Sequence, residues 1–160
     1  MTTAKMKHEY KARIRWTRGD GDFRSGRYSR LHAWDFDEGV SVRASSSPSS
    51  VRLPYSAADA VDPEEALVAA TSSCHMLFFL SFAQKAGFDI DTYEDEASGV
   101  MEEDERGKIS ITSITLRPKI AFAGERRPDA EELADLHHRS HEHCYIANSI
   151  RAEVHVASAE

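Results

Sequence analysis

The 160-residue sequence predicts an α+β protein in which a mainly antiparallel sheet wraps around one long, buried central helix. Two observations carry this prediction. Residues 62–87 form a long apolar segment with helix signals at both ends, and the segments on either side alternate between apolar and polar residues, as strands do. The length suits one domain with a hydrophobic core, so we expect a single domain over 1–160.

The chain before the helix is predicted to form a meander of three strands. The alternation over residues 8–18 is typical of a half-buried strand, with an apolar face made of Tyr10, Ala12, Ile14 and Trp16. Residues 28–36 and 40–45 are predicted as the second and third strands, because turns rich in Gly and Asp precede each of them.

Residues 62–87 predict a helix whose ends are marked in the sequence. Asp62 suits the N-cap, Pro63 the first helical position and Gly87 the C-terminal stop. Almost no polar face remains between these ends, which predicts burial on nearly all sides. The polar residues at 71–73 and His75 interrupt the apolar run, so we interpret the segment as a core helix and expect no membrane partner.

The extended pattern returns after the helix. Residues 88–102 and 108–124 are predicted as two long strands, and Pro118 indicates an edge position or a bulge in the second. Residues 128–144 predict an amphipathic helix, with acidic residues in its first turn and histidines in its last, as the helix dipole favours. A final strand is expected over 150–157.

Charge and cysteine content limit the classes of function. The net charge of −7 argues against nucleic acid or an anionic membrane as the main partner. No hydrophobic segment follows a basic start, so a cytoplasmic location is the default expectation. Cys74 and Cys144 are the two cysteines, and in a reducing compartment such a pair indicates free thiols, a redox pair or metal ligands rather than a structural disulfide.

Cys74 lies in the middle of the predicted helix, too far from its N-terminus for the helix dipole to favour a thiolate. A reactive thiol at this position therefore needs a cation from elsewhere in the fold. The candidates are the neighbouring His75 and four arginines around the first hairpin, namely Arg18, Arg24, Arg27 and Arg30. The alternative is that Cys74 is a small buried hydrophobic residue without a chemical role.

The segment PEEALVAATSSCH resembles the helix signature of the OsmC-like (osmotically inducible protein C / organic hydroperoxide resistance) family. In that family a Pro-Glu pair stands eleven and ten residues before a reactive cysteine, as Pro63 and Glu64 stand before Cys74. A second family cysteine occurs before the last strand, often followed by a small residue and Asn, and HCYIANSI supplies Cys144 and Asn148. The resemblance covers about the whole chain and points to a less-studied branch of the family.

The resemblance implies an OsmC-like fold, an intertwined homodimer and a cofactor-free thiol peroxidase for organic hydroperoxides. Cys74 would become a sulfenic acid, Cys144 would resolve it as a disulfide, and an external dithiol would reduce the disulfide. The family also uses an Arg that stabilises the thiolate and a Glu that holds the Arg. Glu64 matches the Glu by its spacing. Arg30 and Arg18 are the two candidates for the family's Arg. We prefer Arg30, on the second predicted strand, because a strand holds a side chain better than the Gly-Asp turn that contains Arg18.

Two alternatives belong to other classes. The histidines near Cys144, together with Cys74 and His75, would supply ligands for zinc or another soft metal, although their spacing matches no standard zinc pattern; these histidines are His137, His138, His141 and His143. The other alternative is a dimeric redox-sensing or small-molecule-binding protein whose thiols do not turn over. His75 itself is interpreted as a histidine that hydrogen-bonds within the core.

Overall fold

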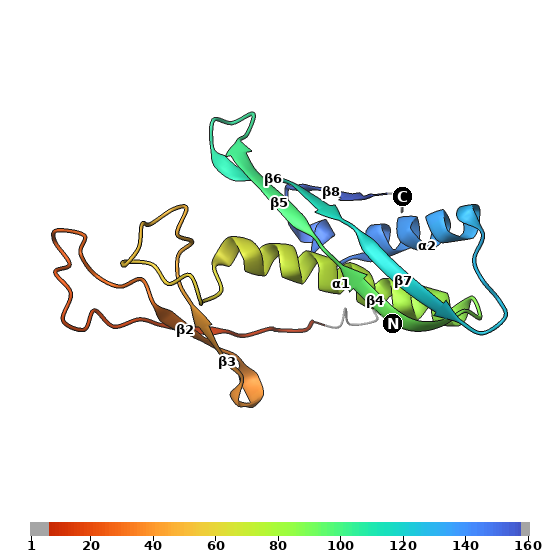
Figure 1. Ribbon diagram of the computed structural model, residues 1–160, viewed down its shortest axis with the longest axis horizontal. Helices are drawn as coiled ribbons and strands as arrows, with labels where there is room; N and C mark the ends of the chain where they lie inside the picture. Colours follow the sequence, from red (N-terminus) through yellow and green to blue (C-terminus); the bar gives the residue numbers. More distant parts are fainter. Residues whose placement is uncertain (1–6, 158–160) are drawn as a thin grey trace, which may run out of the picture. The chain divides into compact units, whose positions relative to one another are not determined.

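The computed structural model describes residues 7–157 and confirms the α+β class, with two α-helices and eight strands in three small sheets (Figure 1). The chain divides into two compact units, one formed by residues up to Pro63 and the other by residues from Glu64 onward. The first unit holds the predicted meander, and the second holds both helices and the remaining strands.

The first unit is an antiparallel sheet of three short strands in the order β1-β2-β3. These strands are β1 (Arg13–Arg15), β2 (His32–Asp35) and β3 (Ser41–Ala44). A 3-10 turn, η1 (Asp37–Gly39), joins β2 to β3, and Gly39 adopts a positive φ of 81° that favours glycine. After β3 the chain returns to the sheet, where Val61 bridges to Ala44.

The predicted half-buried strand over 8–18 is wrong in both length and burial. Only Arg13–Arg15 pair with β2, and all three residues of β1 are exposed, as is Tyr10 at 89%. The physical reason is that residues 7–62 form no α-helix of their own to cover this face. Trp16 packs instead against the ring of Tyr28, with centroids 5.5 Å apart, outside any strand.

The long helix is confirmed as α1 (Pro63–Lys85), which begins one residue after Asp62 and ends two residues before Gly87. Gly87 has a φ of 83°, the left-handed conformation expected after a helix C-terminus. The fully buried side chains of α1 lie four residues apart on one stripe, formed by Thr71, His75, Phe79 and Ala83. Leu77 on the opposite stripe is 60% exposed, so a single chain covers α1 on one side rather than all round.

By length and composition alone, α1 meets the requirements of a membrane span, with a mean hydropathy of 1.6. The polar residues at 71–73 therefore do not exclude a span, contrary to the argument from sequence. The core helix of a globular protein passes the same test. The packing of α1 is that of such a core helix, because His75 hydrogen-bonds to a second helix and Phe79 packs on the ring of Tyr93.

The two long strands predicted after α1 are each broken in the middle. Residues 88–102 form β4 (Asp89–Asp95) and β5 (Ser98–Glu103), and residues 108–124 form β6 (Ile109–Leu116) and β7 (Pro118–Ala123). The pairs β4-β7 and β5-β6 are antiparallel and belong to different sheets. Both breaks fall next to Pro118, which lacks the N–H needed to continue a ladder.

The second helix is α2 (Ala130–His143), which begins with a capping box between Asp129 and Glu132. It is followed by the short turn η2 (Ala147–Ser149) and by β8 (Glu153–Val156), which pairs with β6 in parallel. The helices share one apolar cluster, whose buried members are Phe79, Ala83, Phe88 and Leu136. This packing fixes α2 against α1 in the second unit.

Candidate functional site: two thiols between the helices

The structure brings the two cysteines together, although they are far apart in the sequence. Cys74 lies in the middle of α1, and Cys144 is the C-cap of α2. Both are free thiols, and Cys74 lies close enough to Cys144 to influence the protonation of its thiol. Cys74 is half-buried, whereas Cys144 is only 1% exposed. Solvent therefore reaches the first thiol more easily than the second.

The environment of Cys144 keeps this thiol protonated. Burial, and then the neighbouring Cys74 thiol, raise the pKa of Cys144 above its ordinary value. The backbone N–H of Ala147 donates to Cys144 Sγ at 3.4 Å, and the Cys144 N–H donates to the His141 carbonyl at 3.2 Å. The turn after α2 thus holds the sulfur in place. It is a poor first nucleophile but a well-held second one.

Aromatic rings flank the two thiols. Phe78 lies one turn after Cys74 on α1, and Tyr145 directly follows Cys144; their ring centroids are 5.0 Å apart in an edge-to-face arrangement. Phe82 stacks with Phe78 at 6.1 Å. The chain thus places an aromatic cluster one turn beyond Cys74 on α1 and one residue beyond Cys144.

A pair of histidines, of which His75 is buried and His137 half-buried, also links α1 to α2. His75 Nε2 and His137 Nδ1 are 3.1 Å apart, and the two rings stack with centroids 5.4 Å apart and an interplanar angle of 13°. The interpretation of His75 as a histidine that hydrogen-bonds in the core is therefore confirmed. Burial, and then the neighbouring His137 and His141, lower the pKa of His75 to about 4, and burial lowers that of His137 to about 4.

Sequence reasoning missed the partner of His75 and the polar groups around the pair. Asp95 on β4 accepts hydrogen bonds from the Ser72 hydroxyl at 2.5 Å and from the Arg117 N–H at 2.6 Å. The Tyr93 hydroxyl, also on β4, is buried without a hydrogen-bond partner, and burial raises its pKa well above the ordinary range. The only sequence signal was the position of His75 beside Cys74, because the pairing depends on how the helices pack.

The histidine pair predicts a loss of stability in mild acid. The unfolded chain takes up protons on these two histidines below about pH 6.5, whereas the folded protein keeps them neutral down to about pH 4. The stabilisation is therefore fully present above pH 6.5 and is lost as the pH falls toward 4. The free energy of unfolding should decline by roughly 1–3 kcal/mol per pH unit in this window.

Urea unfolding at several pH values checks this prediction. Asp35 and Asp104 have pKa values lowered to about 2, so their contributions disappear mainly below pH 4 and stay outside the window. The double variant His75→Gln/His137→Asn should remove most of the decline. Stability that stays constant from pH 7 to 4.5 in the unmodified protein would contradict the assignment.

The two arginines proposed for the thiolate differ in how they are held. Arg30 is half-buried and donates to the carbonyls of Gly26 at 2.8 Å and Tyr28 at 2.6 Å, and its guanidinium lies 3.7 Å from the centroid of the Tyr28 ring. It precedes β2 by two residues, so its expected position on a strand is wrong. The loop nevertheless fixes it, whereas Arg18 is exposed and outside any strand.

Glu64 occupies the second position of α1, ten residues before Cys74. At ~1.5 Å per residue, the two lie roughly 15 Å apart along the helix axis. Glu64 therefore does not reach the thiol through its own helix. The structure brings together Cys74, Cys144 and the histidine pair, while Glu64 lies at the far end of α1 and Arg30 belongs to the first unit.

The described residues contain no group of side chains that would support the metal-binding alternative. Within residues 7–157, no three His, Cys, Asp or Glu side chains are arranged to hold a metal ion. His143 illustrates why, because its Nδ1 bonds to the Arg139 carbonyl at 2.9 Å and its ring packs on Phe82. The histidines of the last turn of α2 thus point to different neighbours rather than to a common centre.

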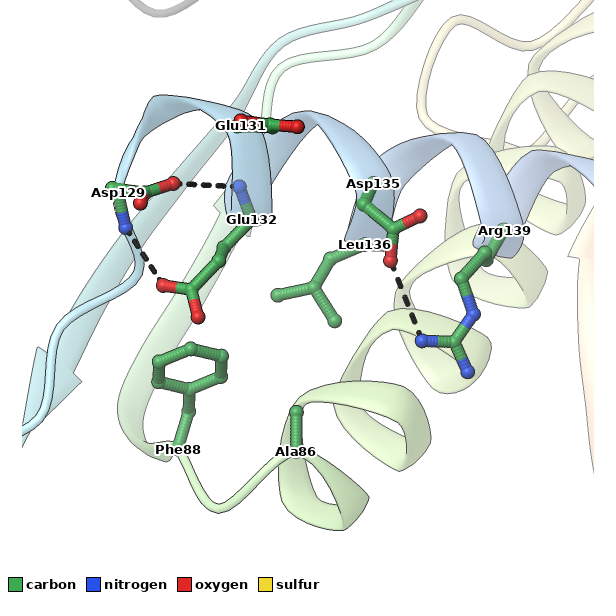
Figure 2. A pocket seen from close by; sticks show the side chains of 8 residues that line it. All are labelled: Ala86, Phe88, Asp129, Glu131, Glu132, Asp135, Leu136 and Arg139. Atoms are coloured by element: carbon green, nitrogen blue, oxygen red, sulfur yellow. Dashed lines mark hydrogen bonds and ion pairs between the residues drawn. The ribbon is translucent and has the colours of Figure 1, made fainter.

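A hollow of about 350 Å³ lies beside the first turns of α2, away from the thiols (Figure 2). Its carboxylate walls are largely occupied, since Asp129 and Glu132 form the capping box and Asp135 pairs with Arg139 at 3.5 Å. Phe88 and Leu136 supply apolar surface. Because Cys144 follows the last turn of this helix, the hollow and the thiol pair are separate features.

Comparisons with known proteins agree with this geometry. The sequence profile described as OsmC-like protein matches residues 56–159. An OsmC-like protein of unknown function from Vibrio cholerae is 44% identical, with a TM-score of 0.92 over 94% of this chain and 99% of its own. Among curated proteins, none matches the chain by sequence.

More distant structures share the fold alone. An organic hydroperoxide resistance protein from Elizabethkingia anophelis is 18% identical, with a TM-score of 0.69 over 96% of this chain and 95% of its own. The organic hydroperoxide resistance protein OhrB of Bacillus subtilis is 19% identical, with a TM-score of 0.62 over 95% and 97%.

An α+β fold with two facing cysteines on its two helices defines a dithiol protein. The match over residues 56–159 and the 44% identity to the Vibrio cholerae protein show the family of this dithiol protein. The chain belongs to the OsmC-like family.

Proposed function

We propose that this protein is a thiol peroxidase that reduces organic hydroperoxides, with Cys74 as the attacking thiol and Cys144 as the resolving thiol. The observation that supports this most directly is the contact between a half-buried Cys74 and a buried Cys144. The family's hydroperoxide resistance proteins, as their names describe them, fit the same chemistry.

The proposed reaction has three steps. The Cys74 thiolate attacks the O–H oxygen of the hydroperoxide and the O–O bond breaks, so that Cys74 becomes a sulfenic acid and the alkoxide takes a proton from water and leaves as the alcohol. The Cys144 thiol then displaces the sulfenic hydroxyl, which leaves with the thiol proton as water, and a Cys74–Cys144 disulfide forms. An external dithiol reduces this disulfide by exchange and is itself oxidised to a disulfide.

The division of labour follows from burial. Cys144 is enclosed and its pKa is raised, so little of it is a thiolate at neutral pH when peroxide arrives. Cys74 is more accessible, and Phe78, one turn further along α1, packs on the rings of Phe82 and Tyr145. An alkyl or aryl peroxide gains apolar contacts there that hydrogen peroxide does not make.

Stopped-flow oxidation of the reduced protein tests the proposal. An aryl hydroperoxide should oxidise Cys74 at least about tenfold faster than hydrogen peroxide, since two buried methylene-sized groups contribute ~0.8 kcal/mol each. With an excess of dithiol, peroxide should be consumed over many cycles. Oxidation that stops after one equivalent would support the redox-sensing alternative, and no oxidation at all would contradict both.

Arg30 is proposed to stabilise the Cys74 thiolate and guide the peroxide, and Glu64 to hold the Arg. Replacing Arg30 with Ala should slow the first oxidation by about tenfold to a hundredfold, because a nearby cation favours the thiolate over the thiol. Arg30→Lys should recover part of the rate, since it keeps the charge but not the planar stacking on Tyr28.

Arg18→Ala is the matched control, because Arg18 is an exposed arginine in the same unit. It should oxidise at the rate of the unmodified protein. The opposite result, with Arg18→Ala slow and Arg30→Ala unchanged, would transfer the role to Arg18 and leave the proposed reaction intact.

The proposed active form is an intertwined cytoplasmic homodimer. The exposed stripe of α1 supports this, since Leu77 is 60% exposed in the single chain although the rest of the helix is strongly apolar. A second subunit that covers such a stripe would remove apolar area from water at ~25 cal/mol per Å².

A further inference from the structure

The two elements that carry the thiols are also joined by the histidine pair. His75 directly follows Cys74 on α1, and His137 precedes Cys144 by two turns on α2. The bond between His75 Nε2 and His137 Nδ1 therefore connects the same two elements as the thiol contact. From this juxtaposition we propose that His75 and His137 are positioning residues that hold Cys144 in reach of Cys74 for disulfide closure.

The remaining contacts between the helices are largely apolar and aromatic, such as Phe79 against the ring of His137 at 4.5 Å. Apolar contacts are non-directional, so they resist separation of the helices more than a small slide or rotation. A hydrogen bond requires a defined distance and angle. The histidine pair thus supplies the directional contact that fixes the register between Cys74 and Cys144.

The arrangement has a cost that apolar side chains would avoid. One imidazole, that of His75, is buried at the helix interface and that of His137 is half-buried, and His75 Nδ1 and the neighbouring His141 Nδ1 are buried without a hydrogen-bond partner. Such buried polar atoms each cost about 1–3 kcal/mol. These unsatisfied atoms reduce what the pair adds to stability at neutral pH, so its main contribution is the geometry of the helix interface, as a positioning role requires.

The charged and titratable groups around the pair make it sensitive to acid. His141 on α2 and Asp95 on β4 act on it, and Asp95 is already engaged by the Ser72 hydroxyl and the Arg117 N–H. The bond needs one donor and one acceptor nitrogen. When both rings are protonated, both nitrogens donate, so the bond breaks and the register is released.

The inference rests on the dithiol of the proposed function but not on peroxide, so the test uses dithiodipyridine as the oxidant. Cys74 attacks the reagent, releases one thiopyridone and becomes a mixed disulfide. Cys144 then displaces the second thiopyridone and closes the protein disulfide. The two absorbance phases report first attack and closure separately. Closure in the absence of any peroxidase activity would overturn the proposed function and leave this inference standing.

His137→Leu should leave the first phase within about twofold and slow closure by about tenfold to a hundredfold, the effect of a misplaced reacting group. His137→Asn should restore much of the closure rate, because its side-chain amide reaches the position of Nδ1. His75→Gln on α1 should likewise close faster than His137→Leu, because its side-chain amide reaches the position of Nε2.

Leu133→Ala is the matched control, since Leu133 packs on the same apolar cluster from α2 but its side chain has no hydrogen-bonding group. It should lower the urea midpoint and leave closure within about threefold. The inference is overturned if His137→Leu closes at the normal rate, or if Leu133→Ala slows closure equally.

If His137→Leu does not fold, the inference is tested by the pH dependence of the closure rate in the unmodified protein. Closure between pH 6.5 and 4 should fall more steeply in the unmodified protein than in His75→Gln/His137→Asn, because only the former loses a bond to protonation. Parallel profiles would overturn the inference.

Discussion

Replacing Cys74 with Ser should abolish the consumption of organic hydroperoxide. The hydroxyl of serine stays protonated at neutral pH and is a far weaker nucleophile than a thiolate, so the rate should fall by several orders of magnitude. The side chains are similar in size, and Cys74 is only half-buried, so the fold should be retained. The measurement is peroxide loss over time with an excess of dithiol.

Two controls accompany this variant. Far-UV circular dichroism and the urea midpoint should match those of the unmodified protein, which separates lost chemistry from lost structure. A serine variant that still consumes peroxide at the normal rate would reject Cys74 as the attacking group and the peroxidase proposal with it.

Replacing Cys144 with Ser should preserve the first oxidation and stop turnover. The first step uses only Cys74, so its stopped-flow rate should remain within about threefold of normal, as expected when an essential step is left untouched. Without the buried thiol, the sulfenic acid has no resolving partner. Further peroxide should therefore convert Cys74 to sulfinic acid, which mass spectrometry detects.

The disulfide itself provides the converse measurement. Peptide mapping after one equivalent of peroxide should find Cys74 linked to Cys144 in the unmodified protein and no such link in Cys144→Ser. Rapid turnover by Cys144→Ser would assign resolution directly to the external dithiol, and Cys144 would then be a structural thiol.

The helices could be predicted from the sequence because their signals are local. Asp62, Pro63 and Gly87 mark the ends of α1, and Asp129 with Glu132 forms the box that starts α2. These residues act on the backbone within one turn of themselves. Periodicity also showed that the remaining segments are extended, which was enough to define the α+β class.

The strand boundaries depend on distant contacts, and there the prediction failed. A single strand over 88–102 fits the pattern, yet it ends at Asp95, where the carboxylate accepts the N–H of Arg117 at 2.6 Å, 22 residues away. The parallel pairing of β8 with β6 is similarly non-local. Alternation along one segment does not specify its partner.

Some residues of the candidate site could likewise be predicted from the sequence, whereas others depend on distant contacts. Cys74 and Cys144 stood out by residue type and spacing, and family resemblance implied their roles. The hydrogen bond between His75 and His137 joins residues 62 positions apart. It follows from the crossing of two helices, so no pattern within either helix indicates it. The position of Arg30 also rests on loop contacts, namely the carbonyls of Gly26 and Tyr28.

The parallel pairing of β6 with β8 has a consequence during synthesis of the chain. β5, the antiparallel neighbour of β6, is already present when β6 emerges, but β8 follows about forty residues after Leu116. At 5–20 residues per second, one edge of β6 waits roughly two to eight seconds for its partner. Until then, the backbone N–H and C=O groups on that edge are unpaired. The side chains of β6 are isoleucines, serines, threonines and one leucine, which favour a strand and carry no charge. A nascent chain therefore exposes a strand edge that favours aggregation until β8 has been synthesised. In chains truncated before Glu153, this edge stays unpaired.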